Sequence, residues 1–280
     1  MIKRVVETIL GANEMEIDSA KLVYFSPTGT TKAVVHGIAH GISPNRVESI
    51  DITTPDVRKQ PLEVSEDELL VVAVPVYMGR VPALIAGWLA SIKAQGVPVV
   101  CVVVYGNRVY DDALLELKNI MKSCGGVPIA CAAYVGEHSF SNAETPIAQG
   151  RPDKDDLSHA EAFGRDIREK LQSTSSVSQL SDVDVPGLYP YGGVTKLWDV
   201  DFIAVSNACT QCGVCADVCP VGAIDLQSSE LIDQKKCITC CACIKSCPQS
   251  ARTIKTGPVK DASKRLNDLF KAPKQPEVFL

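Results

Sequence analysis

The chain has 280 residues, of which 46% are hydrophobic and 22% are charged, and its formal net charge is −5. This length allows one full α/β domain plus a smaller one, and the composition is that of a globular protein. The net negative charge and the absence of a basic, aromatic-rich stripe argue against a nucleic-acid partner. The longest apolar runs, near 69–76 and 97–105, are too short to cross a bilayer, so we expect no membrane span.

Cysteine usage indicates the compartment. Most of the twelve cysteines fall in two short repeats near the carboxyl end, and no small-residue cleavage site follows the charged amino terminus. Disulfide scaffolds belong to secreted proteins, whereas clustered cysteines in a chain of this size indicate metal binding. We therefore expect a reducing, cytoplasmic location.

In chain order, residues 1–19 form a lead-in with the pattern of a short amphipathic helix, and residues 20–172 alternate strands with helices. The alternation favours an α/β fold with a doubly wound sheet of five parallel strands, and a smaller domain follows it. The expected strands are 21–25, 46–52, 69–74, 97–104 and 129–135, and the expected helices include 82–93, 112–123 and 155–172.

The first strand runs into the sequence Ser26-Pro27-Thr28-Gly29-Thr30-Thr31, after which a helical pattern begins. The first amides of a helix are unpaired and its dipole favours negative charge, so this loop predicts an anion site. It has neither the G-x-G-x-x-G of dinucleotide folds nor the G-K-[ST] of P-loops. The alternative is an ordinary helix capped by a threonine.

Two further loops, 75–80 and 105–111, follow the third and fourth strands, and the carboxyl ends of parallel strands meet at one sheet edge. The Thr28–Thr31 loop resembles the phosphate loop of flavodoxins, a resemblance that covers about residues 20–172. It implies FMN as the cofactor, with its phosphate on the first loop and its ring between the other two. The residues it implies for FMN are Ser26, Thr28, Gly29, Thr30, Thr31, Pro75, Val76, Tyr77, Met78, Gly79, Tyr105, Gly106, Asn107, Arg108 and Tyr110.

The same resemblance makes Tyr77, together with Tyr105 or Tyr110, candidates to stack on the flavin ring. For each tyrosine taken alone, the alternative is a partly exposed aromatic at a strand end. The resemblance further implies that the Met78-Gly79 peptide unit flips so that its carbonyl accepts a hydrogen bond from the protonated flavin N5, which would stabilise a neutral semiquinone. Gly79 tolerates the positive φ that this flip needs.

Two arginines, Arg80 and Arg108, stand where flavodoxins often crowd the flavin with acidic residues. If they face the ring, they favour its reduced form. The alternative is that both point into solvent.

The long loop 136–152 leaves the fifth strand near the proposed flavin edge. Its Glu137-His-Ser-Phe and Gly150-Arg-Pro-Asp strings, with Tyr105-Gly-Asn-Arg, resemble the flavodoxin–ferredoxin fusion proteins of anaerobes, over most of the chain. His138 is either a proton donor to flavin or substrate, or a loop histidine bonded to the backbone.

Residues 173–200 are expected to be a polar linker, and residues 258–280 a closing helix with a loose tail after 270. The resemblance to the fusion proteins implies that residues 201–257 form a small α+β ferredoxin domain with two clusters. Trp198 and Phe202 are expected to pack in a core or an interface. Of the cysteines outside the repeats, Cys101, Cys124 and Cys131 are expected to be small apolar residues.

The first repeat, residues 209–220, and the second repeat, residues 237–248, each read C-x2-C-x2-C-x3-C-P. This is the bacterial signature for cubane iron–sulfur clusters, in which the fourth cysteine of one repeat ligates the cluster of the other. One [4Fe-4S] cluster should therefore take Cys209, Cys212, Cys215 and Cys247, and the second should take Cys237, Cys240, Cys243 and Cys219.

A zinc ribbon would use only four of these eight thiols, and the chain lacks a secreted context for disulfides. The repeats resemble two-cluster bacterial ferredoxins over about residues 203–256. Cys241 lies beside a ligand but off the repeat, and we expect it to be a small buried residue.

Together these patterns predict an electron-transfer flavo-iron–sulfur protein that works with redox partner proteins, either as a carrier or as a module docked on a larger oxidoreductase. The alternative is an FMN-dependent reductase of a small molecule, fed by its own clusters. A homodimer is also compatible with the sequence, which leaves open whether transfer from flavin to cluster stays within one chain.

Overall fold

The computed structural model describes residues 18–180, 182–193 and 199–280. The expected lead-in helix lies almost wholly outside the described residues, as does Trp198. Ser19, the last residue assigned to the lead-in, already begins the first strand.

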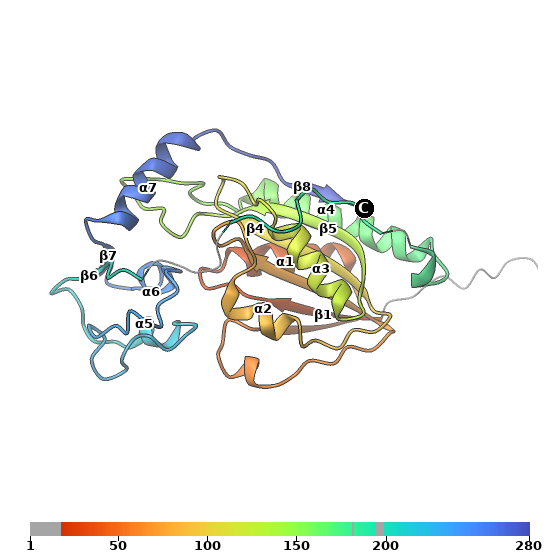
Figure 1. The fold of residues 1–280 in the computed structure, drawn as a ribbon, viewed down its shortest axis with the longest axis horizontal. Helices are drawn as coiled ribbons and strands as arrows, with labels where there is room; N and C mark the ends of the chain where they lie inside the picture. Colours follow the sequence, from red (N-terminus) through yellow and green to blue (C-terminus); the bar gives the residue numbers. More distant parts are fainter. Residues whose placement is uncertain (1–17, 181, 194–198) are drawn as a thin grey trace, which may run out of the picture.

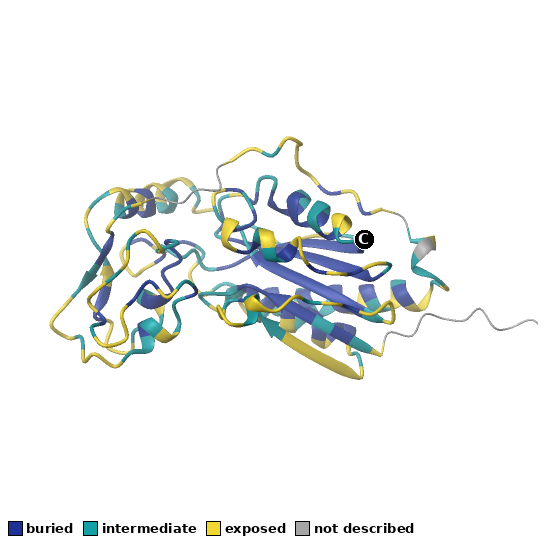
Figure 2. Ribbon diagram, turned by 60° about the horizontal axis from the view of Figure 1, so that its bottom comes forward, coloured by how far each residue is buried: buried dark blue, intermediate teal, exposed yellow. Residues whose placement is uncertain are grey.

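The larger domain is built on a parallel sheet whose strands follow the order β2-β1-β3-β4-β5 (Figure 1). This order reverses direction between β1 and β3, which is the switch point where ligands of doubly wound folds bind. The central strands are buried on both faces, which explains their unbroken valine-rich runs, whereas β2 is an exposed edge (Figure 2). The predicted parallel strands are thus confirmed as β1 (Ser19–Tyr24), β2 (Arg46–Asp51), β3 (Glu68–Pro75), β4 (Pro98–Tyr105) and β5 (Val127–Val135).

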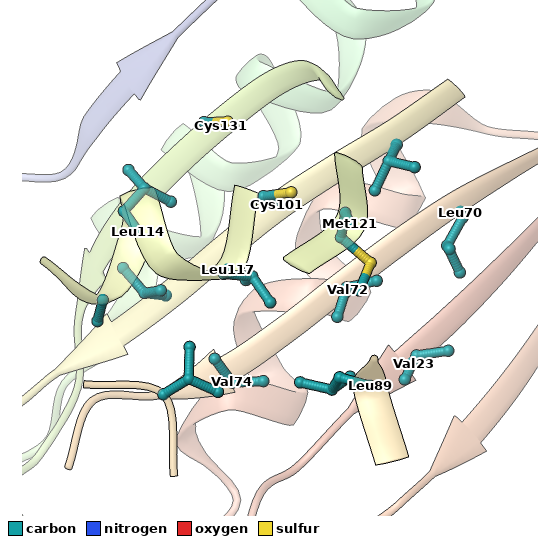
Figure 3. Packing of buried hydrophobic residues seen from close by; sticks show 14 of the residues in the cluster. Val23, Leu70, Val72, Val74, Leu89, Cys101, Leu114, Leu117, Met121 and Cys131 are labelled. Carbon is teal, nitrogen blue, oxygen red and sulfur yellow. The ribbon is translucent and has the colours of Figure 1, made fainter. Parts of the chain in front are cut away.

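Helices cover both faces of the sheet. The helices α1 (Thr30–Ile42) and α4 (Lys154–Gln172) pack on one face, and α2 (Ala83–Leu89) and α3 (Ala113–Ser123) pack on the other. Figure 3 shows Leu114, Leu117 and Met121 of α3 in the second of these cores, where Cys101 and Cys131 serve as the small apolar residues expected of them.

The helix α2 ends earlier than the predicted residue 93. The Lys93 amide donates to the Leu62 carbonyl (2.9 Å), and the Val64 amide donates to the Lys93 carbonyl (3.0 Å). These bonds pull the chain into a strand-like bridge, so the helix cannot continue. A short 3-10 helix, η1 (Val57–Lys59), precedes this bridge.

The carboxyl-terminal tail is not loose, and the prediction for it was wrong. Its strand β8 (Glu277–Phe279) pairs antiparallel with β5 and becomes the sixth strand of the sheet. An unpaired edge strand offers free backbone groups that another strand can satisfy. The Tyr110 hydroxyl donates to Glu277 (2.8 Å), which fixes the tail further.

The segment predicted as a linker is also tied down. After the 3-10 helix η2 (Val177–Gln179), Val183 and Val185 are buried in the α3 side of the core. The carboxylate of Asp112, at the start of α3, accepts the amides of Leu188 (2.8 Å) and Gly192 (2.7 Å). This segment therefore runs along α3 and back to the sheet's carboxyl edge.

The smaller domain contains a two-stranded sheet of β6 (Ile203–Val205) and β7 (Arg252–Ile254), with the short helices α5 (Val214–Asp217) and α6 (Ala242–Lys245). Its core includes Phe202, as expected, and Cys241. The helix α7 (Pro258–Leu269) follows, and the chain then returns to β8 on the larger domain (Figure 1). None of the described helices is long and apolar enough to cross a membrane.

Candidate functional site

A cavity of about 430 Å³ lies where the loops after β1, β3 and β4 meet, so the three loops converge as expected. Small-molecule sites in proteins commonly measure about 300–1,000 Å³. Most of the residues proposed for FMN line it: Ser26, Thr28, Thr30, Thr31, Pro75, Val76, Tyr77, Met78, Gly79, Tyr105, Gly106 and Arg108.

Three residues proposed for FMN lie outside the cavity lining. Tyr110 is buried edge-to-face against Tyr105 with its hydroxyl bound to Glu277, so of these two tyrosines only Tyr105 borders the cavity. The Asn107 amide donates to the carbonyls of Phe270 (2.7 Å) and Ala272 (3.0 Å) and thereby holds the end of α7. Gly29 acts through its backbone, which takes a φ of 87° before α1 begins.

The first loop presents hydroxyl groups at the amino terminus of α1. The Ser26 hydroxyl accepts the Lys32 amide (3.0 Å), whereas no threonine side chain caps this helix. The Thr31 hydroxyl is buried and has no partner within the described residues. A buried hydroxyl without a partner costs about 1–3 kcal/mol, so this atom needs a hydrogen-bonding ligand.

The second loop is a tight turn in which Tyr77 and Arg80 exchange two backbone hydrogen bonds of 3.0 Å each. Met78 and Gly79 both take positive φ angles, 54° and 80°, as a mirror-image hairpin turn requires. A Cβ atom on Gly193 would stand 2.5 Å from the Met78 carbonyl oxygen. That carbonyl therefore faces Gly193, which itself lines the cavity, and its hydrogen bond to flavin N5 stays a prediction.

The Tyr77 ring borders the cavity and meets Phe25 edge-to-face at 6.5 Å between ring centres. Burial raises the pKa of Tyr77 well above its ordinary value, and the neighbouring thiols of Cys240 and Cys241 raise it further. The Tyr77 hydroxyl thus lies close to the second cysteine repeat.

The two arginines differ. Arg80 forms a two-pronged ion pair with Glu116 (2.7 and 2.8 Å) and lies over the Tyr191 ring, outside the cavity lining. Arg108 lines the cavity and is paired with Asp111. Only one of the two arginines therefore borders the candidate site.

The loop after β5 forms another wall, with Gly136, Glu137, His138, Ser139 and Phe140 in the lining. The His138 Nδ1 atom accepts the Phe140 amide (3.0 Å). Burial lowers the pKa of His138 to about 4, and the charges of Lys245 and Arg108 act in the same direction. The ring is therefore neutral near pH 7, with its proton on Nε2, as expected for a histidine bonded to the backbone.

The remaining wall comes from residues that sequence reasoning missed. Ile238 and Thr239 of the second repeat line the cavity, as do Ala262, Arg265 and Leu266 of α7. The unusual length of loop 136–152 had already indicated that this loop lies near the flavin edge. Nothing in the local sequence of the second repeat or of α7 indicates a role at the flavin loops.

Polar bonds hold the smaller domain against this edge. Arg58 donates to the Pro220 carbonyl (2.5 Å), and Lys245 donates to the Ser141 carbonyl (2.6 Å) and pairs with Glu137. The Thr145 hydroxyl bonds to that of Ser263 in α7 (2.6 Å). The cavity is thus shared by the two domains.

The eight repeat cysteines gather in two crossed groups. Cys209, Cys212, Cys215 and Cys247 line one small pocket, which takes its fourth thiol from the second repeat. The Ala251 amide donates to the Cys247 sulfur (3.3 Å), and the Ala223 amide donates to the Cys219 sulfur (3.2 Å). Both fourth cysteines therefore have the same local geometry.

The second group is more buried. Burial raises the pKa of the Cys237, Cys240 and Cys243 thiols, and Cys219 lies close enough to raise each of them further. Buried thiols of this kind ionise only beside positive charge, which metal ions supply. No described group of three or more His, Cys, Asp or Glu is gathered tightly enough for a single metal ion. Cluster ligands stand further apart, since each binds a different iron.

Comparison with known proteins bears on both halves. A family described as a 4Fe-4S binding domain matches residues 204–225. A ferredoxin-like protein in the nif region of Sinorhizobium fredii (strain NBRC 101917 / NGR234) is 45% identical over 40 residues, which are 14% of this chain and 62% of that protein. The chain thus spans less than two thirds of this relative's length.

Solved structures similar to the larger domain include a flavodoxin from the domain Archaea, 20% identical over 55% of this chain and 98% of the other, with a TM-score of 0.38. The Streptococcus pneumonia TIGR4 flavodoxin is 19% identical over 54% of this chain and 99% of the other, with a TM-score of 0.39. The Fusobacterium nucleatum flavodoxin bound to flavin mononucleotide is 13% identical over 54% and 98%, with a TM-score of 0.36.

The strand order and helix layers are those of the flavodoxin-like fold, and the cysteine-rich region carries the ferredoxin match. The chain therefore joins a flavodoxin-like domain to a 4Fe-4S ferredoxin-type region, the combination found in flavodoxin–ferredoxin fusion proteins.

Proposed function

We propose that this protein carries electrons between FMN and two [4Fe-4S] clusters and exchanges them with redox partner proteins. The observation that carries the proposal is the placement of the second cysteine repeat against the cavity formed by the three flavodoxin-type loops. Clusters exchange single electrons and flavin one or two, so a chain with both joins one-electron carriers to two-electron chemistry.

The cavity fits FMN on two counts. Among the residues that the structure describes, the Thr31 hydroxyl is buried without a partner at the amino terminus of α1, where a phosphate is favoured. Tyr77 and Tyr105 border the same cavity from the second and third loops, where their rings can stack on the flat flavin ring. The residues for the phosphate are Ser26, Thr28, Thr30 and Thr31, and Gly29 provides the turn that exposes their amides.

The thiols fit two clusters because each group of four draws three from one repeat and one from the other. A single cluster would leave the other four thiols without a metal to bind. The amide bonds to the Cys219 and Cys247 sulfurs stabilise the thiolate form of both.

The content of iron and flavin tests the proposal. Protein purified without oxygen should contain about eight iron atoms, as two [4Fe-4S] centres require, and one FMN. A Thr30→Trp variant should lose flavin and keep its iron. Iron equivalent to one cluster, or a flavin content near zero, would refute the proposal.

The alternative function is reduction of a small molecule at the flavin, and the exposed cation Arg265 at the cavity favours it. Reduction by dithionite followed by mixing with candidate acceptors separates the two. Turnover of a small molecule without a partner protein would replace the carrier function by the reductase function.

A further inference from the structure

The loop between Cys237 and Cys240 carries a feature that cluster binding does not use. Its Thr239 is 7% exposed, and its hydroxyl is buried without a partner within the described residues. Thr239 also lines the FMN cavity, together with Ile238. A buried hydroxyl without a partner needs a hydrogen-bonding atom, as the Thr31 hydroxyl also does.

The equivalent loop of the first repeat is built differently. Gln211 occupies the position of Thr239 and has a similar positive φ, 55° against 59°. Its side chain is used within its own domain, where the amide oxygen accepts the Ser229 amide (2.8 Å). Thr210, the counterpart of Ile238, is exposed and lies outside the FMN cavity. The two loops thus have the same backbone conformation, but only the loop of the second repeat borders the cavity.

The two thiol groups also differ in how exposed their cysteines are. Cys212 of the first group is exposed, whereas Cys240 and Cys243 of the second group are buried. The first group therefore has a thiol at the surface, and the second group is the one whose loop lines the cavity.

We propose that Thr239 is a flavin-binding residue and that the second-repeat cluster is the one that exchanges electrons directly with FMN. The first-repeat cluster then meets the external one-electron carrier protein. This order rests on the proposed function, because it requires both clusters and FMN to be bound.

The electron balance is simple. The carrier protein gives one electron to the oxidised first-repeat cluster, which passes it to the second-repeat cluster and returns to its oxidised state. Two such passages deliver two electrons to FMN, and the protons come from solvent. The reverse direction balances in the same way with an oxidised carrier as acceptor.

The first test measures FMN affinity by dilution of the holoprotein. Thr239→Val removes only the hydroxyl and should weaken FMN binding about fivefold, which corresponds to about 1 kcal/mol for one neutral hydrogen bond. The matched change Thr210→Val should leave the affinity unchanged. Thr239→Ser keeps the hydroxyl and should bind FMN as the native protein does, even if the valine variant loses its cluster. Equal affinities for the Thr239→Val and Thr210→Val proteins, or a loss with Thr239→Ser, would overturn the assignment.

A second test needs no change at Thr239. The EPR signals of the two reduced clusters, assigned with Cys219→Ser and Cys247→Ser proteins, are titrated against potential with FMN bound and after its removal. The midpoint potential of the second-repeat cluster should shift on FMN removal, and that of the first-repeat cluster should not. A shift confined to the first-repeat cluster, or none in either, overturns the proposed order. Protein with one cluster or without FMN would instead refute the proposed function.

Discussion

The two cysteine repeats have the same spacing, yet the fold gives them different surroundings. The first repeat keeps Cys212 at the surface, and the described residues that line its small pocket all belong to its own domain. The second repeat has buried ligands, and its loop forms a wall of the cavity at the sheet edge. Equal ligand patterns thus predict equal clusters, while docking on the larger domain decides which repeat borders the cavity proposed for FMN.

The larger domain forms a bond to each repeat, and both bonds lie beside the second thiol group. Arg58 of the larger domain reaches the carbonyl of Pro220, the residue after Cys219, and Lys245 reaches the loop after β5. Both bonds act on the second thiol group or beside it.

The crossed cysteines give the largest expected effect. Cys247→Ser should remove the first-repeat cluster, about four of eight iron atoms, and leave FMN in place. Cys219→Ser should remove the same amount of iron and also weaken FMN binding, because its cluster shapes the loop of Thr239. Iron and flavin analysis of the two proteins measures both effects. Identical flavin content in the two would contradict the contrast between the repeats.

The buried His138 on the cavity wall should make the folded protein less stable at acid pH. The folded protein keeps His138 neutral with a pKa of about 4, against about 6.5 in an unfolded chain. The unfolded state therefore binds the additional proton. The stability from neutral His138 is complete above about pH 6.5 and is lost as the pH falls toward about 4, by at most about 3 kcal/mol.

Unfolding measured across this pH range should show a flatter profile for His138→Asn than for the native protein. The control is His40→Asn, because His40 is exposed on α1. A flattening of similar size in the control would show that the pH dependence lies elsewhere.

Docking by Lys245 gives the next effect. Lys245→Met leaves Glu137 and the Ser141 carbonyl without their cation, and hydrogen bonds to charged groups contribute about 1.5–3 kcal/mol. We expect a loss of about 2 kcal/mol in unfolding free energy, together with weaker FMN binding. Lys236→Met removes an exposed pair with Asp233 and should cost about 0.5 kcal/mol or less. Denaturant unfolding of both variants measures the difference. Equal losses of unfolding free energy would show that Lys245 does not hold the two domains together.

The smallest effect concerns the flavin potential. Arg265 of α7 lines the cavity, and a cation there stabilises the anionic reduced flavin. Arg265→Gln should lower the two-electron potential of FMN by about 20 mV, which corresponds to about 1 kcal/mol. Lys264→Gln changes a neighbouring exposed cation outside the cavity lining and should leave the potential within a few mV. A rise in potential for the Arg265 variant would contradict this placement.

Much of the candidate site could be predicted because it is local. The Thr28–Thr31 loop follows a strand and begins a helix, so its position at the sheet edge depends only on secondary structure. Asn107 and Tyr110 belong to a loop that does line the cavity, and the loop pattern therefore predicts both as FMN residues. Their side chains instead bond to the carboxyl-terminal segment. A loop pattern does not say which of its side chains face the ligand, since that depends on what packs behind them.

The cysteine spacing and the alternation of strands and helices determined the fold class and the chemistry of the thiol groups, because both depend on periods of a few residues. The tertiary structure alone decided which repeat approaches the flavin loops, that β8 closes the sheet edge, and that Thr239 and Arg265 meet residues far away in sequence. These contacts depend on how two domains dock. Docking is set by surface complementarity between distant segments, which no short pattern in the chain records.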